Sequence, residues 1–171
     1  MRLLFEMDAK DYDPHDLAYV RPSVRSILIR ENRVAMVYSP VYDYYKFPGG
    51  GIEPGESREA ALARETLEEA GLIIRPDSVR TYGYVHRIQR GRREAVFIQD
   101  HYYYFCEAEP LPVPQRLDGY EAEEGFTLTF ADPAAAIRTN REGAHGPKDP
   151  RMLEREARVL EMLIREGYFT A

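Results

Sequence analysis

The chain has 171 residues, of which 44% are hydrophobic and 30% are charged, which is enough for one globular domain with a real core. A net charge of -6, with scattered Lys and Arg residues, argues against a general nucleic-acid-binding protein. The apolar runs are too short to span a membrane, and a charged residue occurs too early in the chain for a secretory signal. The lone Cys106 suits a reducing compartment. We therefore expect a cytoplasmic protein.

The first third of the chain is expected to supply strands and the approach to a loop. Residues 1–22 contain a short apolar stretch and a turn, and they are expected to add an edge strand or to cover one side of the core. Two β-rich runs follow at residues 24–29 and 34–38, and the Glu31-Asn32 pair between them predicts a hairpin. Residues 40–46 then lead to a glycine-rich loop.

A glycine-rich loop and a helix occupy residues 50–72, and the rest of the chain is organised around them. Ser57 suits the N-cap of this helix, and Gly71 suits the left-handed residue that ends it. At about 100° per residue, one small apolar face is predicted to pack on the core. Its members are Ala60, Ala63, Leu67 and Ala70.

Three glutamates of the same helix, Glu65, Glu68 and Glu69, are spaced i, i+3, i+4 and are expected to share the roughly opposite face. Close carboxylates repel one another, and they lie near the helix end where the dipole disfavours anions. A hard divalent cation such as Mg²⁺ or Mn²⁺ would turn this cost into a binding site, because it prefers oxygen ligands. The alternative is a solvated acidic face.

The remaining elements are strands and two further helices. Strands are predicted over residues 79–89, 94–107 and 126–130, with a proline-rich loop at 109–118. A short helix follows from Pro133, and a longer one runs over 149–167 from the start signal Asp149-Pro150. Its expected core face comprises Leu153, Ala157, Leu160 and Ile164.

This order of elements predicts an α/β sandwich, in which a mixed sheet lies between the helix of residues 50–72 and the C-terminal helix. No internal repeat or linker is visible, so residues 1–171 are expected to form a single domain. His86 and His101, in the two long strands, have no metal-ligand spacing around them, and we interpret both as structural.

Residues 50–72 resemble the signature of the Nudix (MutT-like) hydrolases, Gly-x5-Glu-x7-Arg-Glu-U-x-Glu-Glu-x-Gly-U, where U is a bulky apolar residue. Only Thr66 departs, because it stands where an aliphatic residue is usual. The Phe47-Pro48-Gly49-Gly50 lead-in is also similar to the family. The resemblance implies a Nudix-type α/β/α sandwich. The matching residues are Gly50, Glu56, Arg64, Glu65, Glu68, Glu69, Gly71 and Leu72.

The resemblance implies an enzyme that hydrolyses a phosphoanhydride bond in a nucleoside diphosphate linked to another group. The implied cofactor is Mg²⁺, with Mn²⁺ as a substitute. Its implied ligands are the side chains of Glu65, Glu68 and Glu69 and the backbone carbonyl of Gly49. Gly50, Glu56, Arg64 and Gly71 are implied to be structural, with an ion pair between Glu56 and Arg64 that ties the loop to the helix.

The general base is implied to be either a glutamate of residues 50–72 or a later carboxylate. Among Glu121, Glu123 and Glu124, we favour Glu121, and the alternative is that all three are solvated loop acids. For the substrate, the resemblance implies a phosphate contact by Arg25, and Tyr44 and Phe47 are the candidates for stacking on a base. The alternatives are an exposed strand arginine and aromatic core packing.

The substrate itself is the least determined property. The chain has no Trp, and it has no proline between Pro76 and Pro110, which disfavours the patterns typical of NADH-cleaving and ADP-ribose-cleaving relatives. A nucleoside triphosphate is therefore the default, and ADP-ribose, nucleotide sugars and dinucleotides are the alternatives. A non-catalytic nucleotide sensor is the alternative of another class. A homodimer is left open, with residues 1–22 or the C-terminal helix as its candidate surface.

Overall fold

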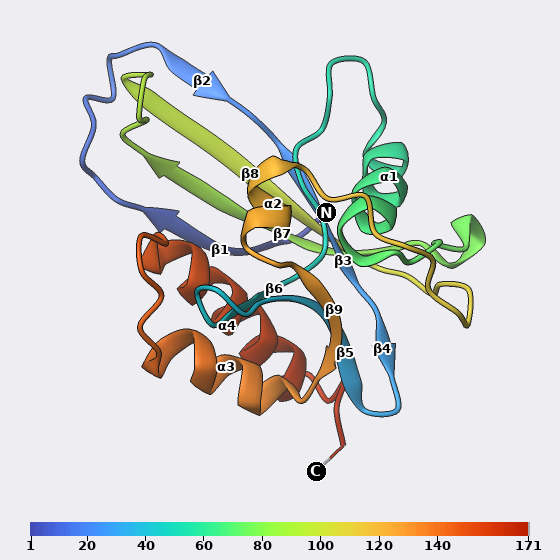
Figure 1. Cartoon of the computed structure of the whole chain (residues 1–171). Coiled ribbons are helices and arrows are strands. Elements are labelled where there is room, and N and C mark those ends of the chain that lie inside the picture. Colours follow the sequence, from blue (N-terminus) through green and yellow to red (C-terminus); the bar gives the residue numbers. More distant parts are fainter. Residues whose placement is uncertain (171) are drawn as a thin grey trace.

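The computed structural model describes residues 1–170, and its strands form two sheets (Figure 1). In the first sheet the two long strands pair antiparallel, and three short strands join them in parallel. These strands are β1 (Leu3–Asp8), β7 (Arg80–Gln89), β8 (Val96–Phe105), β2 (Ala18–Val20) and β3 (Ser23–Ile27). The second sheet is antiparallel and contains β4 (Ile29–Arg30), β5 (Arg33–Ser39), β6 (Tyr44–Lys46) and β9 (Thr127–Ala131).

Helices lie on both sides of the strands. In Figure 1, α1 lies on one side, and α3 and α4 lie together on the other. The arrangement is an α/β/α sandwich with mixed strands, so the predicted fold class is confirmed. The helices are α1 (Arg58–Ala70), α2 (Gly119–Glu123), α3 (Pro133–Glu142) and α4 (Pro150–Arg165), and a short 3-10 helix, η1 (Pro76–Ser78), precedes β7.

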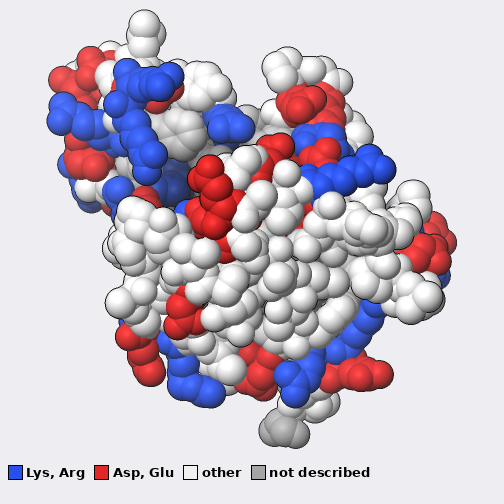
Figure 2. Space-filling view, in the orientation of Figure 1, with Lys and Arg blue, Asp and Glu red and all other residues white. Residues whose placement is uncertain are grey.

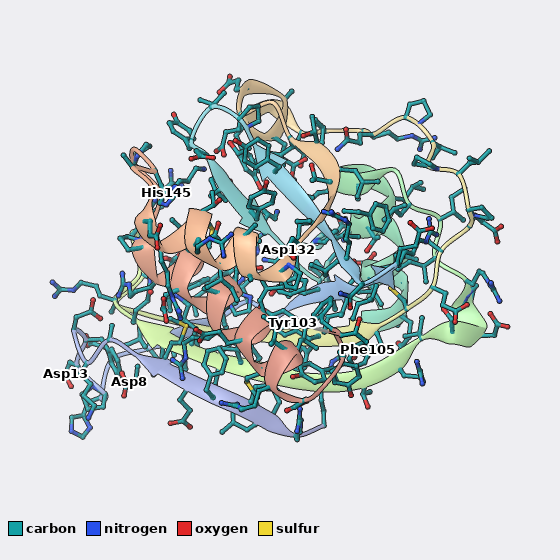
Figure 3. All side chains as sticks on the ribbon, turned by 90° about the horizontal axis from the view of Figure 1, so that it is seen from below. Asp8, Asp13, Tyr103, Phe105, Asp132 and His145 are labelled. Atoms are coloured by element: carbon teal, nitrogen blue, oxygen red, sulfur yellow. The ribbon has the colours of Figure 1, made fainter. Side chains whose placement is uncertain are left out.

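The core has two parts, one on each face of the strands. Along β5, Ala35 and Val37 pack with Leu62 of α1, whereas Val34 and Met36 pack on the α4 side. This alternation follows from the two-residue period of a strand that is buried on both faces. Seen from below, α3 and α4 lie in front of the sheet, with Tyr103 and Phe105 on the face that α4 covers (Figure 3).

Most predicted strands are present. Residues 1–22 supply two edge strands, because β1 pairs with β7 and β2 pairs with β8. The hairpin at Glu31-Asn32 is confirmed, and both residues have positive φ, as tight β-hairpin turns require. Among the helices of residues 1–170, none is long and apolar enough to cross a membrane.

The predicted packing faces of two helices are wrong in part. Ala60 and Ala63 of α1 are exposed, because the helix turns its larger Leu62 toward the sheet instead. Thr66, in the usual aliphatic position, is fully buried on the same face. In α4, Ile164 is 38% exposed, and Leu163 takes its place in the core.

Candidate active site

The glycine-rich loop is held along the free edge of β3 by backbone hydrogen bonds. Ser26 N donates to Pro48 O at 2.9 Å, and Val24 N donates to Gly50 O at 3.0 Å. Gly49 has a φ of 140°, and a Cβ atom at this position would lie 2.0 Å from Val24 O. Only glycine permits such a close approach, so the loop has a fixed path beside β3.

Helix α1 is fixed at both ends, and this sets the direction of its glutamates. Ser57 accepts a hydrogen bond from Ala60 N at 3.1 Å, and Gly71 adopts the left-handed conformation, so both predicted caps are present. The proline-rich loop covers the other end of the helix, where Val113 N donates to Gly71 O and Arg116 N donates to Glu68 O, both at 2.8 Å.

Arg64 connects the loop to the helix. Its Nε and Nη2 atoms donate to the two carboxylate oxygens of Glu56 at 2.8 and 2.9 Å, and Nη2 also donates to Gly51 O at 3.1 Å. The guanidinium of Arg64 holds the pKa of Glu56 below its ordinary value. The structure therefore contains the Glu56–Arg64 ion pair that the resemblance implied.

Two of the three helix glutamates converge on one cationic atom. Arg64 Nη1 lies 2.7 Å from Glu65 Oε1 and 3.3 Å from Glu68 Oε2. The Glu65 carboxylate also lies against the glycine loop, because a Cβ atom on Gly50 would be 2.3 Å from Glu65 Oε2. Burial raises the pKa of Glu65, and Arg64 opposes this shift. Two carboxylate oxygens that converge on one position suit a hard divalent cation.

The third glutamate, Glu69, lies on the buried face of α1 and is only 2% exposed. One of its oxygens pairs with Lys46 Nζ, and the other accepts a hydrogen bond from Gly49 N at 2.9 Å. Across residues 1–170, no three acidic, histidine or cysteine side chains gather where they could hold a metal ion. The structure thus brings Glu65 and Glu68 together without Glu69, and the four-ligand set with the Gly49 carbonyl stays a prediction.

The three candidate acids near α2 have different surroundings. Glu121 is 5% exposed, and its Oε2 accepts a hydrogen bond from Asp118 N at 2.9 Å. Burial raises the pKa of Glu121, and the nearby Glu69 raises it further. Glu124 accepts a hydrogen bond from Tyr44 at 2.7 Å and pairs with Lys148, whereas Glu123 is exposed. Of the three, Glu121 lies beside a glutamate of α1.

The predicted substrate contacts lie behind the loop or in the core. Arg25 is buried and donates a hydrogen bond to the Gly49 carbonyl. Tyr44 is buried, and Phe47 packs edge-to-face on Tyr103 with ring centroids 5.5 Å apart. Their roles toward a substrate stay predictions. For the two aromatic residues, the placement agrees with the core packing that the sequence left as the alternative.

A cleft of about 760 Å³ opens beside the two converging glutamates. Glu65, Glu68 and Arg64 of α1 line it, together with Arg21, residues of β2, and Asp118 of the α2 approach. Basic and acidic side chains lie close together on the upper part of the molecule in Figure 2, whereas the centre of this face is uncharged.

Arg21 is a cleft residue that the sequence analysis missed. Its Nη2 and Nε atoms lie 3.0 and 3.1 Å from the position that a Cβ of Gly51 would occupy, so the guanidinium lies flat on the loop. Within residues 1–170, its side chain has no hydrogen-bond or ion-pair partner. The only signal in the sequence is a basic residue just before Pro22 at the start of a strand, which is not specific.

A buried ion pair of α4 holds the start of the glycine loop. Glu156 is fully buried, and its Oε2 accepts a hydrogen bond from Phe47 N at 2.8 Å. Its Oε1 accepts one from Arg155 Nε at 2.9 Å, and Arg155 is also buried. The sequence analysis missed both residues, because adjacent charges on an amphipathic helix usually indicate a solvated face.

The same network reaches the other end of the loop through His101. Arg155 Nη1 lies 2.9 Å from His101 Nε2, and arginine only donates, so Nε2 accepts and the Nδ1 proton is directed to Ser23 Oγ at 2.7 Å. Ser23 pairs with Gly51 across a β-bridge. Burial lowers the pKa of His101 well below its ordinary value, as do Arg155 and two further arginines. A neutral His101 thus links α4 to β3.

Comparison with known proteins gives a family and a fold. The family described as the NUDIX domain matches residues 20–151. Three solved structures show the same fold. A NUDIX hydrolase from Nitrosomonas europaea has a TM-score of 0.56 and 18% identity, and the match covers 88% of this chain and 89% of that one. A MutT protein from Bacillus halodurans has a TM-score of 0.55 and 18% identity over 70% of this chain and 72% of that one, and the ORF135 protein of E. coli has a TM-score of 0.53 and 19% identity over 86% and 92%.

We predict that Glu56→Gln destabilises the fold by about 1–3 kcal/mol at pH 7, because it removes charge-assisted hydrogen bonds to Arg64. Because the pKa of Glu56 is lowered in the folded protein, the carboxylate stabilises the fold above the ordinary carboxyl pKa, and this stabilisation is lost as the pH falls through the lowered pKa. Urea unfolding at pH 7 and pH 3 should therefore show that the free energies of unfolding of Glu56→Gln and wild type differ less at pH 3 than at pH 7. The exposed Glu123→Gln is the control, and an equal difference at both pH values contradicts this role.

We also predict that Glu156→Gln costs about 3–5 kcal/mol, because it leaves the buried Arg155 without a counter-charge. The matched control is Glu161→Gln on the same helix, where the partly exposed pair with Arg141 contributes about 1 kcal/mol or less. Urea unfolding of both variants measures the contrast. Equal losses in the two variants would contradict a larger stabilisation of the fold by the buried pair.

Proposed function

This chain belongs to the Nudix hydrolase family, and on that premise we propose that it is a Mg²⁺-dependent pyrophosphohydrolase acting on a nucleoside triphosphate. The bond cleaved is a phosphoanhydride in a nucleoside diphosphate linked to another group. The observation that carries the proposal is the cleft that Glu65, Glu68 and Arg21 line together. Such a cleft combines oxygen ligands for a cation with a cationic group for phosphate.

The acidic and the basic residues of the cleft have complementary tasks in this proposal. The carboxylates of Glu65 and Glu68 would hold the metal ion, which supplies charge neutralisation of the phosphate and a more acidic bound water. Without that positive charge, the two carboxylates would repel a polyphosphate. Arg21 would donate hydrogen bonds to phosphate oxygens, because its guanidinium has no partner among residues 1–170.

Glu121 is the proposed general base. It is held by the backbone of Asp118, a cleft residue, and lies beside Glu69 of α1. Its raised pKa makes the carboxylate a better proton acceptor than an exposed glutamate. Glu124 is less suited, because Lys148 and Tyr44 already occupy its oxygens.

The proposal is tested by product release from nucleoside triphosphates, ADP-ribose, nucleotide sugars and dinucleoside polyphosphates, with Mg²⁺, with Mn²⁺ and with EDTA. We predict turnover of triphosphates that EDTA abolishes. Glu68→Gln should lower kcat about 100-fold or more, because it weakens the site of the metal ion. The exposed Glu59→Gln, on the same helix, should keep wild-type activity.

Each other outcome assigns the chain differently. Turnover of ADP-ribose or a dinucleotide in preference to triphosphates replaces the proposed substrate with that class. Binding of a compound without turnover of any would favour the nucleotide sensor. Activity that survives EDTA and Glu68→Gln together would contradict the metal site at Glu65 and Glu68.

For Arg21, we predict that Arg21→Ala lowers kcat/KM about 10- to 100-fold, the value of a lost charge-assisted hydrogen bond to phosphate. The change should appear mainly in KM, because the contact exists in both the ground state and the transition state. Arg80→Ala, an exposed arginine outside the cleft, is the matched control. Unchanged kinetics in Arg21→Ala would show that substrate does not contact Arg21.

A further inference from the structure

Lys46 is a buried lysine on the strand that leads into the glycine loop. It is only 7% exposed, and it projects from β6 on the side that faces α1. Its Nζ atom pairs with Glu69 Oε1 and lies 5.1 Å from the centroid of the Phe126 ring. A buried ammonium group needs such a counter-charge, because its desolvation is otherwise unfavourable.

Both oxygens of the Glu69 carboxylate have partners in the protein. One oxygen holds the ammonium of Lys46, and the other accepts the hydrogen bond from Gly49 N at 2.9 Å. Glu69 therefore fixes the loop backbone and neutralises the lysine at the same time. Glu121 is a further charged neighbour of this pair.

The surroundings of Glu65 and Glu68 differ in a way that matters for a metal ion. Their shared partner, Arg64 Nη1, is at the cleft, and Arg64 keeps Glu56 and the Gly51 carbonyl as partners through its other nitrogens. A cation can replace this single nitrogen without leaving the arginine unpaired. At Glu69, by contrast, a divalent cation would share a buried carboxylate with an ammonium group, and the two positive charges would repel each other.

We propose that Lys46 is a built-in cation that replaces a metal ion at Glu69, so that metal binding depends on Glu65 and Glu68 but not on Glu69. This inference rests on the proposed metal dependence of the site, and it goes beyond it by dividing the three glutamates into two groups. Glu69 is then a positioning residue for the Gly49 backbone.

The test is Mn²⁺ binding to the purified full-length chain without nucleotide, measured by calorimetry and by the electron paramagnetic resonance signal of free Mn²⁺. We expect Glu65→Gln and Glu68→Gln to weaken Mn²⁺ binding about tenfold or more, as loss of a ligand does. The double variant Lys46→Met/Glu69→Gln removes both charges of the buried pair, and it should bind Mn²⁺ as wild type does.

The single variant Lys46→Met should bind Mn²⁺ about tenfold more tightly or bind one additional ion, because it frees the Glu69 carboxylate. Lys148→Met is the matched control, since Lys148 also pairs with a buried glutamate, Glu124, and it should leave Mn²⁺ binding unchanged. Where Lys46→Met does not fold, as judged by circular dichroism, the double variant alone decides the question.

Two results would overturn the inference. The first is a double variant that loses Mn²⁺ affinity as strongly as Glu65→Gln does. The second is a folded Lys46→Met whose Mn²⁺ binding equals that of wild type. Mn²⁺ binding is measured without nucleotide, so it is independent of the hydrolysis assay. A chain that hydrolyses no nucleotide could still support the inference about Lys46, and an active enzyme could still contradict it.

Discussion

The backbone pairing between the glycine loop and β3 is the constraint on which the rest of the site depends. It places Gly49 so close to Val24 that no side chain fits between them. The loop carbonyls and amides then have fixed directions, and the side chains of α1 must meet them there. Arg64 reaches Gly51 O, and Glu69 reaches Gly49 N, so the helix and the loop form one rigid unit.

Three cations determine how negative charge is distributed around this unit. Arg64 pairs with Glu56 and with the cleft residues Glu65 and Glu68, and Lys46 pairs with Glu69 in the interior. Arg25 donates a hydrogen bond to the Gly49 carbonyl. The pKa of Glu56 is lowered by its arginine, whereas burial raises the pKa of Glu65. Carboxylates that are neighbours along one helix therefore have different chemistry, because their partners and their solvation differ.

Helix α4 contributes to the site although it lies on the opposite face of the strands. Through Glu156 it binds the amide of Phe47, and through Arg155 and His101 it reaches Ser23 beside Gly51. Both ends of the loop are thus fixed from the same helix. Burying these charges costs desolvation free energy, which the hydrogen bonds of the Arg155 nitrogens and of both Glu156 oxygens offset. The network couples the stability of the C-terminal helix to the geometry of the loop.

The sequence by itself determined the local features of this protein: the caps at Ser57 and Gly71, the Glu31-Asn32 hairpin, most strands, and the α/β/α class with its family signature. Spacing along a helix gives the angles between its side chains around the helix axis, but it does not determine which face of the helix packs on the sheet. Only the tertiary structure therefore decided that Leu62 and Glu69 face inward while Ala60 does not. It also brought together residues that are distant in sequence, such as Arg21 with Glu65, Lys46 with Glu69, and Glu156 with Phe47. Such contacts depend on how whole elements pack, and no local pattern encodes them.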